Sequence, residues 1–363
     1  MKRLVFATGG TGGHIFPALA IATEAKKRGY DCHFIGQEQG MEARLIPEQF
    51  PFIGVAAGKL DRQRPNPLAV LRNVKGVIEA IGALRKLEPA LVIGFGGFAS
   101  FPALAAARLL GKPYVLHETN AYPGLVTRLF ARGAKLVLAS QNSTFDHLPK
   151  TLSAHVVGHP VKEEYVDKVT ARAQLGLPQD ALITYVTGGS QGSLFLNTHV
   201  PDAFTGLSSQ MPHAVLHSTG KRWLADVEKG SAGLMNYFTK DFVNATLAWS
   251  AADLAICRAG YGTLSEAAFH GVPCIMIPLP TAAENHQFHN AQAFARAGAG
   301  WVMEENQIGS LAMMWQEKLN IQTLSEASQA ALKLSPKGAS TTFMKLIDSY
   351  FQLSNGASLG SAA

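Results

Sequence analysis

Short apolar runs alternate with longer stretches of helical spacing along most of the chain. In the first half, the apolar runs predict strands with the sequences RLVFAT, DCHFIG, PFIGVA, ALVIGF, PYVLHE and KLVLAS. Strands that alternate with helices are typical of a parallel sheet covered on both faces. Ligands of such sheets gather at the carboxyl ends of the strands.

The pattern begins again after residue 165, with LITYVTGG, HAVLHS, DLAICRAG and PCIMIPL. It also repeats a local motif, because FATGGTGG at 6–13 has a counterpart in YVTGGSQG at 185–192. Each copy consists of a strand, T-G-G, a further glycine and a helix. The repeat predicts two similar α/β domains facing each other across a cleft, with a break near 156–168 where a glycine, a proline and charges interrupt the pattern. A length of 363 residues fits two domains.

Glycine-rich turns between a strand and a helix expose backbone N–H groups where phosphate binds well. A third such turn lies in IGFGGFASFPALAAA, residues 93–107. A nucleotide is therefore the expected ligand. Neither of the paired loops matches G-x-G-x-x-G or a Walker motif, so the loops give no support to a dinucleotide oxidoreductase. The alternative is that the glycines only make tight turns.

Composition narrows the class of protein. The net charge of +6 favours an anionic partner, such as phosphates, nucleic acid or a membrane surface. No apolar run is long enough to span a bilayer, and the first residues do not resemble a signal peptide. Cys32, Cys257 and Cys274 are few and far apart. They are expected to be reduced core thiols in a cytoplasmic protein without zinc.

Together the motifs resemble the bacterial glycosyltransferases that add N-acetylglucosamine to lipid I in peptidoglycan synthesis. The matching segments are TGGTGGHIFPALAIA, GFGGFASFPALAAA, HETNAYPGLVTRLFAR, VVGHPV, GGSQGS, CRAGYGTLSEAA and ENHQFHNAQAFARAGAG. They follow the family order and extend from residue 5 to about residue 300.

The resemblance implies the GT-B architecture of two Rossmann-like domains. It places an acceptor-binding domain at 1–160, a UDP-sugar-binding domain at 161–339, and a helix returning to the first domain at 340–363. It implies UDP-GlcNAc and lipid I as substrates, an inverting transfer, and a peripheral position on the cytoplasmic face of the bacterial inner membrane. Other wall-synthesis and division proteins are further candidate partners, and no nucleic acid is expected.

Two residues are candidates for catalysis. His14 ends the first glycine loop at a helix start, where the dipole disfavours imidazolium and keeps the ring able to accept a proton from an acceptor hydroxyl. The alternative is a histidine that caps the helix or packs under Phe16. Glu118, the last residue of the run PYVLHE, is a candidate acid–base group or a supporting one.

The resemblance also implies which residues bind the donor. They are Thr11, Gly12, Gly13, Asn120, Lys162, Ser190, Gln191, Phe242, Val243, Tyr261, Gly262, Thr263, Leu264, Ser265, Glu266, Gln287 and Asn290. Phe242 and Val243 correspond to the segment that binds uracil. Gln287 and Asn290 resemble residues that read the sugar hydroxyls, although they also fit an ordinary polar helix face.

Glu266 has two competing interpretations. Thr263 and Glu266 have the T-x-x-E spacing of a capping box. In the family, the matching glutamate holds the ribose hydroxyls of UDP, and this role is favoured here.

The sequence departs from the family at two places. AGYG stands where SGAL is usual, so Ala259 lacks a serine hydroxyl. Lys162 stands where the family has arginine, which keeps the charge and loses the bidentate fork, unless His159 compensates.

One stretch, residues 62–87, is a candidate membrane surface. Its basic start and the apolar residues beside it are Arg62, Arg64, Leu68, Leu71, Arg72 and Lys75. The positions Leu68, Leu71, Val74, Ile78, Ile81 and Leu84 have helical spacing. We expect most of this stripe to pack on the sheet, and the basic start to face an anionic lipid.

No D-x-D motif or His/Asp cluster is present, so neither a catalytic metal nor another cofactor is expected. The alternatives to this function are another GT-B lipid glycosyltransferase, a UDP-GlcNAc epimerase, or a non-catalytic UDP-sugar-binding scaffold in wall synthesis.

Overall fold

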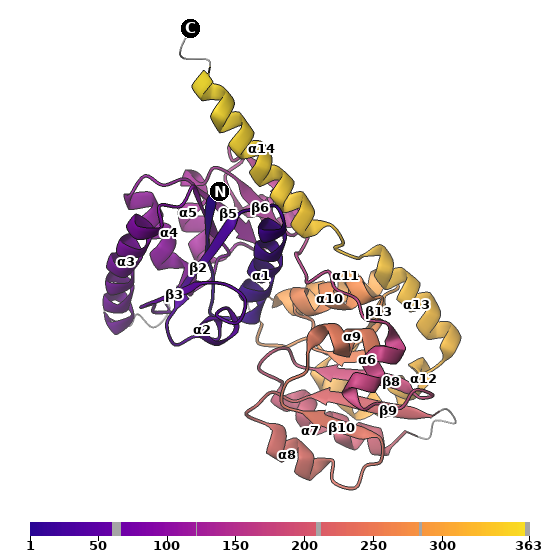
Figure 1. The fold of residues 1–363 in the computed structure, drawn as a ribbon. Helices are drawn as coiled ribbons and strands as arrows, with labels where there is room; N and C mark the ends of the chain where they lie inside the picture. Colours follow the sequence, from indigo (N-terminus) through magenta and orange to yellow (C-terminus); the bar gives the residue numbers. More distant parts are fainter. Residues whose placement is uncertain (60–66, 121, 208–211, 283–284, 360–363) are drawn as a thin grey trace. The chain divides into compact units, whose positions relative to one another are not determined.

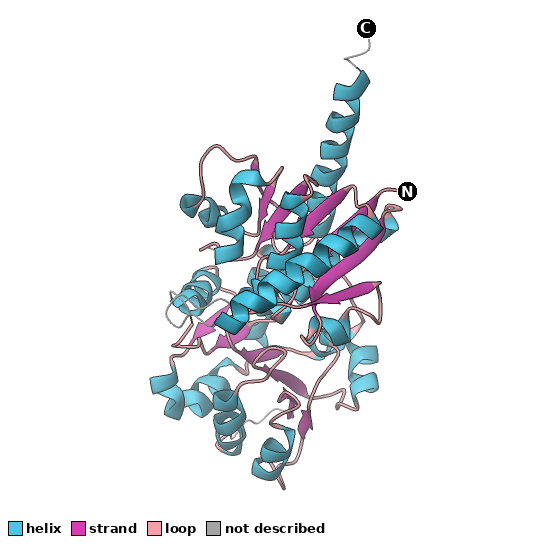
Figure 2. Cartoon of the chain, turned by 90° about the vertical axis from the view of Figure 1, so that its left-hand side faces the viewer, coloured by secondary structure: helices cyan, strands magenta, loops and turns pink. Residues whose placement is uncertain are grey.

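The computed structural model describes residues 1–59, 67–120, 122–207, 212–282 and 285–359. The chain forms two compact units. Unit 1 comprises Met1–Lys162 together with Gly338–Ala363, and unit 2 comprises Glu163–Lys337. The sequence placed these boundaries at 160/161 and 339/340. Figure 1 shows the elements of both units, and Figure 2 shows helices covering the strands of each sheet.

Unit 1 contains a seven-stranded parallel sheet with the order β3-β2-β1-β4-β5-β6-β7. Its strands are β1 Arg3–Ala7, β2 Asp31–Gln37, β3 Phe52–Val55, β4 Leu91–Gly94, β5 Tyr114–Glu118, β6 Val137–Ala139 and β7 Ala154–Val156. Its α-helices are α1 Gly12–Lys27, α2 Glu42–Leu45, α3 Pro67–Leu87, α4 Phe101–Leu109, α5 Leu125–Phe130 and α14 Ala339–Leu359. Short 3-10 helices are η1 Phe98–Ser100, η2 Ala131–Gly133 and η3 Asn142–His147.

Apolar clusters cover both faces of this sheet, as the continuous hydrophobic strands predict. Close packing on one face depends on small residues. A Cβ on Gly76 of α3 would lie 1.7 Å from the carbonyl oxygen of Ala56, so only glycine allows this approach. Small residues therefore allow the close approach of α3, and Leu84 and Leu87 near its end are also buried.

The last helix, α14, packs on α1 of unit 1 (Figure 1). Phe343 lies in the core beside Phe95 and His117. Arg28, the C-cap residue of α1, donates to Asp348 at 2.7 Å, and the Tyr30 hydroxyl donates to the same carboxylate. Both apolar burial and a partly buried ion pair therefore hold the first half of α14 on unit 1.

Unit 2 contains a six-stranded parallel sheet with the order β10-β9-β8-β11-β12-β13. Its strands are β8 Leu182–Thr187, β9 His213–Ser218, β10 Tyr237–Lys240, β11 Leu254–Cys257, β12 Cys274–Met276 and β13 Gly300–Val302. Its helices are α6 Lys168–Leu175, α7 Leu194–Thr205, α8 Leu224–Gly230, α9 Ala245–Ala251, α10 Tyr261–His270, α11 His286–Arg296, η5 Glu305–Ser310, α12 Leu311–Lys318 and α13 Ile321–Lys333.

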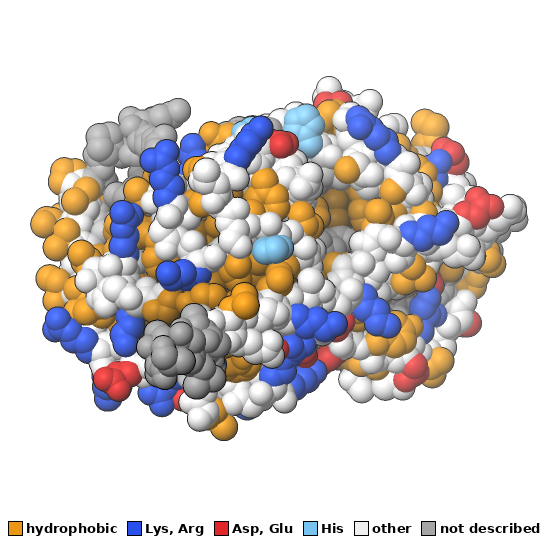
Figure 3. All heavy atoms as spheres, turned by 90° about the horizontal axis from the view of Figure 1, so that it is seen from above, with side chains coloured by type: hydrophobic (Ala, Val, Ile, Leu, Met, Phe, Trp, Pro, Cys, Tyr) orange, Lys and Arg blue, Asp and Glu red, His pale blue; other side chains and the backbone are white. Residues whose placement is uncertain are grey.

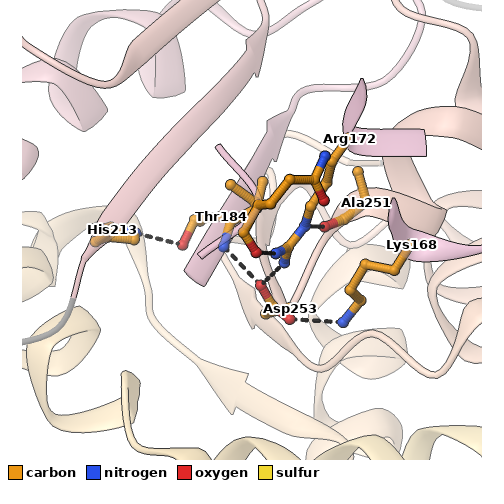
Figure 4. A network of polar contacts seen from close by, with 8 residues as sticks. Lys168, Arg172, Thr184, His213, Ala251 and Asp253 are labelled. Carbon is orange, nitrogen blue, oxygen red and sulfur yellow. Dashed lines mark hydrogen bonds and ion pairs between the residues drawn. The ribbon is translucent and has the colours of Figure 1, made fainter. Parts of the chain in front are cut away.

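A polar network anchors the amino ends of β8 and β11 (Figure 4). Asp253 accepts hydrogen bonds from Arg172 at 2.6 Å, Lys168 at 2.7 Å and the Ile183 amide at 2.7 Å. Arg172 is buried and also donates to the carbonyl of Ala251. This network lies at the edge opposite the strand ends where ligands of parallel sheets bind, so its role is to hold the unit together.

Candidate functional site

The first glycine loop joins β1 to α1 in unit 1. Gly9 and Gly10 have φ angles of 144° and 85°, which disfavour any residue with a Cβ. Beneath the loop lies Glu42, a fully buried carboxylate on α2. It accepts hydrogen bonds from the amides of Gly10 at 3.2 Å and Gln37 at 3.1 Å. One backbone N–H of this glycine loop, that of Gly10, is thus used inside the protein rather than presented to a ligand.

His14 lies in the first turn of α1 and is half-buried. Its Nδ1 atom is 3.1 Å from the hydroxyl of Thr11, the N-cap residue of the helix. A Cβ on Gly97 would lie 3.1 Å from the same nitrogen. The glycine turn after β4, which contains Gly97, therefore borders the ring. Burial lowers the pKa of His14, and the charges of Glu118 and Glu42 oppose this shift. The neutral ring expected from the sequence therefore results chiefly from burial.

Glu118 ends β5 and is 2% exposed. Its Oε1 accepts from the backbone and side-chain nitrogens of Asn120, both at 3.0 Å. Its Oε2 accepts from the amide of Gly124 at 3.0 Å and from the hydroxyl of Thr127 at 2.6 Å. With both oxygens occupied, this carboxylate fixes the turn that presents Asn120. The geometry favours the supporting role for Glu118 over direct proton transfer.

The second glycine loop joins β8 to α7 in unit 2. Gly189 and Gly192 have φ angles of 83° and 71°. A Cβ on Gly192 would lie 1.8 Å from the carbonyl oxygen of Thr219, whereas one on Gly189 meets no atom within 4 Å. Ser190 and Gln191 are exposed between these glycines. The loop thus presents polar groups at the start of a 12-residue helix, as diphosphate binding requires.

Arg258, which follows β11, is a site residue that the sequence reasoning missed. It is 8% exposed, and its guanidinium lies 5.2 Å from the ring centre of Phe195. It donates to the Ser193 hydroxyl at 3.1 Å, to the carbonyl of Ile277 at 3.1 Å and to Glu305 at 2.6 Å. Arg258 therefore ties the glycine loop to the segment after β12. The only signal in the sequence was an arginine directly after a strand.

The capping-box interpretation of Thr263 and Glu266 is wrong. Helix α10 begins at Tyr261, with Gly260 as its N-cap and no side-chain cap, so Glu266 lies beyond the first turn. Instead, Glu266 Oε2 accepts a hydrogen bond from the indole N–H of Trp249 at 2.9 Å. Burial raises the pKa of Glu266 to about 7, and the Trp249 hydrogen bond opposes this rise. A half-buried carboxylate held this way is suited to binding hydroxyl groups.

The remaining donor candidates of unit 2 lie around the same strand ends. Gln287 Oε1 accepts from the amide of Leu279 at 3.0 Å, and Asn290 Nδ2 donates to the carbonyl of Ala259 at 3.2 Å. Phe242 follows β10 and is 57% exposed, while Val243 beside it is buried. In α10, Tyr261, Gly262 and Thr263 are half-buried, and Leu264 and Ser265 are buried.

In unit 1, Thr11 and Gly13 are exposed, Gly12 is buried, and Asn120 is half-buried. Lys162 is exposed and is the last residue of the Met1–Lys162 stretch of unit 1. His159 cannot compensate for the arginine that Lys162 replaces. The His159 side chain is buried, and its Nδ1 atom lies 3.3 Å from the Ser140 hydroxyl oxygen. Burial lowers the pKa of His159 to about 3, so the ring carries no positive charge at neutral pH.

The expectation for the apolar stripe of α3 needs a correction. Its buried side consists of Ala69, Asn73, Gly76, Ala80, Leu84 and Leu87. Leu68, Leu71, Val74 and Ile78 are instead 55–66% exposed, because the small residues face the protein. Arg72 and Lys75 are exposed among them, and Arg62 and Arg64 lie outside the described residues. Figure 3 shows apolar and basic side chains beside one another at its left-hand side, where α3 lies in Figure 1.

No described helix is both long and apolar enough to cross a bilayer. No three His, Cys, Asp or Glu side chains within the described ranges are grouped as a metal site requires.

Replacing Glu266 with glutamine should stabilise unit 2 at alkaline pH while weakening donor binding. A carboxyl whose pKa is raised from 4.5 to about 7 makes the folded state lose stability as pH rises through that window. Glutamine does not ionise, so it avoids this loss in the free energy of unfolding, which is at most about 3 kcal/mol. Its side-chain oxygen can still accept the hydrogen bond from the Trp249 N–H. We expect a higher Tm than the parent at pH 8, converging with it near pH 5, and a raised KM for UDP-GlcNAc. Lower stability with an unchanged KM would contradict the ribose assignment.

Comparisons with known proteins agree with this geometry. Residues 4–139 match the glycosyltransferase family 28 N-terminal domain, and residues 183–347 match the family 28 C-terminal domain. The chain is 44% identical to the UDP-N-acetylglucosamine--N-acetylmuramyl-(pentapeptide) pyrophosphoryl-undecaprenol N-acetylglucosamine transferase of Deinococcus deserti, covering 96% of this chain and 99% of the relative. It is 40% identical to the Thermus thermophilus protein of the same name, with the same coverage.

A solved structure of MurG from Acinetobacter baumannii superposes with a TM-score of 0.72 at 28% identity, covering 96% of this chain and 100% of that one. The two-sheet architecture is therefore shared over almost the whole length. The chain belongs to glycosyltransferase family 28 and has the two parallel-sheet domains of the GT-B fold.

Proposed function

We propose that this chain transfers N-acetylglucosamine from UDP-GlcNAc to lipid I, forming lipid II, with inversion at the sugar carbon. The observation that carries the proposal is identity of 40–44% over 96% of the chain to enzymes named for this transfer. The residues at the strand ends of each unit supply the groups that such a reaction needs.

Unit 2 binds the donor. The Ser190–Gln191 turn and the amides at the start of α7 receive the diphosphate, and Arg258 holds that loop in place through Ser193. Glu266 accepts hydrogen bonds from the ribose hydroxyls. The segment at Phe242 and Val243 receives the uracil ring.

Unit 1 supplies the base. The acceptor hydroxyl oxygen forms a bond to the sugar carbon as the bond from that carbon to the phosphate oxygen breaks, and UDP leaves with the electron pair. His14 takes the hydroxyl proton. In the tautomer with the hydrogen on Nδ1, His14 donates it to the Thr11 hydroxyl, and Nε2 is the nitrogen that accepts the proton. Glu118 holds Asn120 beside the reacting sugar.

An acceptor-dependence assay separates this proposal from its alternatives. UDP should be released from UDP-GlcNAc only when a lipid I analogue is present. An epimerase would convert the donor without any acceptor, and a binding scaffold would give no product in a single turnover with excess protein.

Chelation should leave most of the activity intact, because the positive end of α7 and cationic side chains stabilise the leaving UDP. A catalytic metal contributes several kcal/mol, so its removal would lower the rate by more than about 100-fold. The measurement is the initial rate with and without EDTA. Loss of activity that magnesium or manganese restores would contradict the metal-free mechanism.

The outer face of α3 docks on the anionic cytoplasmic surface of the bacterial inner membrane, where the acceptor lies. Leu68, Leu71 and Ile78 supply the apolar contact, and Arg72 and Lys75 supply the charge. Such a face gives peripheral attachment without a spanning helix.

Arg72→Gln/Lys75→Gln should weaken binding to anionic vesicles by roughly 30-fold at low salt, since each basic residue near such a surface contributes about 1 kcal/mol. Arg85→Gln/Lys86→Gln is the matched control, because it removes equal charge from exposed positions in the last turn of the same helix. Co-sedimentation measures both. Equal loss in the two variants would mean that general charge, rather than this face, drives attachment.

A further inference from the structure

The ribose candidate Glu266 depends on a neighbour that comes from a different helix. Trp249 of α9 is 2% exposed, and its indole N–H is the donor to Glu266 Oε2 at 2.9 Å. Its ring stands at 90° to that of Tyr185 on β8, with the ring centres 4.9 Å apart. Burial and the contact with Tyr185 therefore fix the direction in which this N–H points.

We propose that Trp249 is a positioning residue for the donor nucleoside: its N–H holds one oxygen of Glu266 so that the carboxylate meets the ribose hydroxyls in a fixed orientation. The inference rests on the proposed ribose role of Glu266. Among the described residues, no donor hydrogen-bonds the other oxygen, Oε1. That oxygen and the remaining lone pair of Oε2 are the acceptors for two hydroxyl groups.

The same hydrogen bond favours the charged form of Glu266. Burial raises the pKa of this carboxyl, and the Trp249 N–H opposes the rise. Without the N–H, more of the carboxyl is protonated at neutral pH. A protonated carboxyl has lost acceptor capacity and binds the ribose less well.

Other titratable groups near α10 are few. Burial raises the pKa values of Tyr185 and Tyr261, and lowers the pKa of His270 to about 4, so these three keep one charge state from pH 6 to 8.5. The helices that pack on α10 contribute His286, His289 and Arg296 from α11 and Glu326 and Lys333 from α13, while α9 has no ionisable side chain. All of these are unchanged by a substitution at Trp249, so a difference between two pH profiles isolates Glu266.

The test is Trp249→Phe, with UDP binding measured by calorimetry from pH 6 to 8.5. Trp315→Phe is the matched control, since Trp315 is also fully buried in unit 2 and donates its N–H at 3.1 Å, but to the Thr184 hydroxyl. We expect Trp249→Phe to weaken UDP binding about tenfold at pH 7, as for loss of a hydrogen bond to a charged group. The defect should shrink toward pH 8.5, where Glu266 is ionised in both proteins. Binding of 2′,3′-dideoxy-UDP should be unchanged.

Three results would overturn the inference. One is unchanged UDP affinity in Trp249→Phe while Glu266→Gln weakens binding, which leaves the proposed function standing. Another is an equal loss in Trp315→Phe, which indicates general loosening of the unit. The third is unchanged UDP affinity in both Trp249→Phe and Glu266→Gln, which also removes the ribose role from the proposed function. If Trp249→Phe does not fold, benzothienylalanine at this position replaces only the N–H with sulfur, and the same comparison applies.

Discussion

Replacing His14 with alanine is expected to lower kcat by about 100-fold or more, while the KM for UDP-GlcNAc changes little. A positioned general base contributes roughly 100- to 10,000-fold to a rate. The ring is held by Thr11 and bordered by Gly97, and burial lowers its pKa, so it is neutral and able to accept a proton at pH 7. Steady-state kinetics with a lipid I analogue measures the effect.

The matched control is His33→Ala. This histidine lies near the start of β2 in the same sheet and pairs with Asp31 at 2.9 Å, away from the carboxyl ends of the strands. It should retain the parental kcat. If His14→Ala also retains it, another group removes the proton, and His14 has only a structural role in the first turn of α1.

Among alanine substitutions of glycines in the second glycine loop, which joins β8 to α7, Gly192→Ala is expected to destabilise unit 2 most. The new Cβ would lie 1.8 Å from the carbonyl oxygen of Thr219, so the loop and the end of β9 must separate. Gly189→Ala shares the positive φ but meets no atom within 4 Å. Gly189→Ala should therefore lower the free energy of unfolding of unit 2 only by its conformational cost, about 1 kcal/mol. Gly192→Ala should lower it by at least about 2 kcal/mol more.

Tryptophan fluorescence during urea unfolding measures this pair directly. All four tryptophans of the chain, Trp223, Trp249, Trp301 and Trp315, lie in unit 2, so the signal reports that unit alone. The donor KM should rise at least tenfold in Gly192→Ala, because the loop is displaced. Equal midpoints for the two variants would show that the backbone contact with Thr219 does not constrain the loop.

The central strands were predictable because burial on both faces leaves a continuous apolar run. Each apolar run identified in the sequence forms a strand. The three strands that were missed, β7, β10 and β13, are all at sheet edges. Their residues are mostly half-buried or exposed, as in AHV at β7, so no apolar run distinguishes them from loops.

The sites that sequence reasoning missed depend on partners distant along the chain. Glu42 holds the amide of Gly10, 32 residues away, and Arg258 holds Ser193, 65 residues away. Local spacing carries no information about either contact. The same limit explains the wrong capping box, since the T-x-x-E spacing is local and the partner that Glu266 has, Trp249, lies on another helix.

The stripe on α3 was misjudged for a different reason. Helical spacing of large apolar residues usually marks the face that packs on the core. Here a second stripe, of Ala69, Gly76 and Ala80, packs together with Leu84, the one member of the predicted stripe that is fully buried, because close approach to Ala56 leaves no room for a Cβ at Gly76. Periodicity finds an apolar face, and only the packing shows which of two faces is buried.

The most direct test of the proposed transfer is to incubate the purified chain with radiolabelled UDP-GlcNAc and a lipid I analogue. The account predicts that label moves to the lipid in equal amount to the UDP released, and that the new glycosidic bond has the configuration opposite to that of the donor. Label that stays on the nucleotide sugar, or a product with retained configuration, would contradict it.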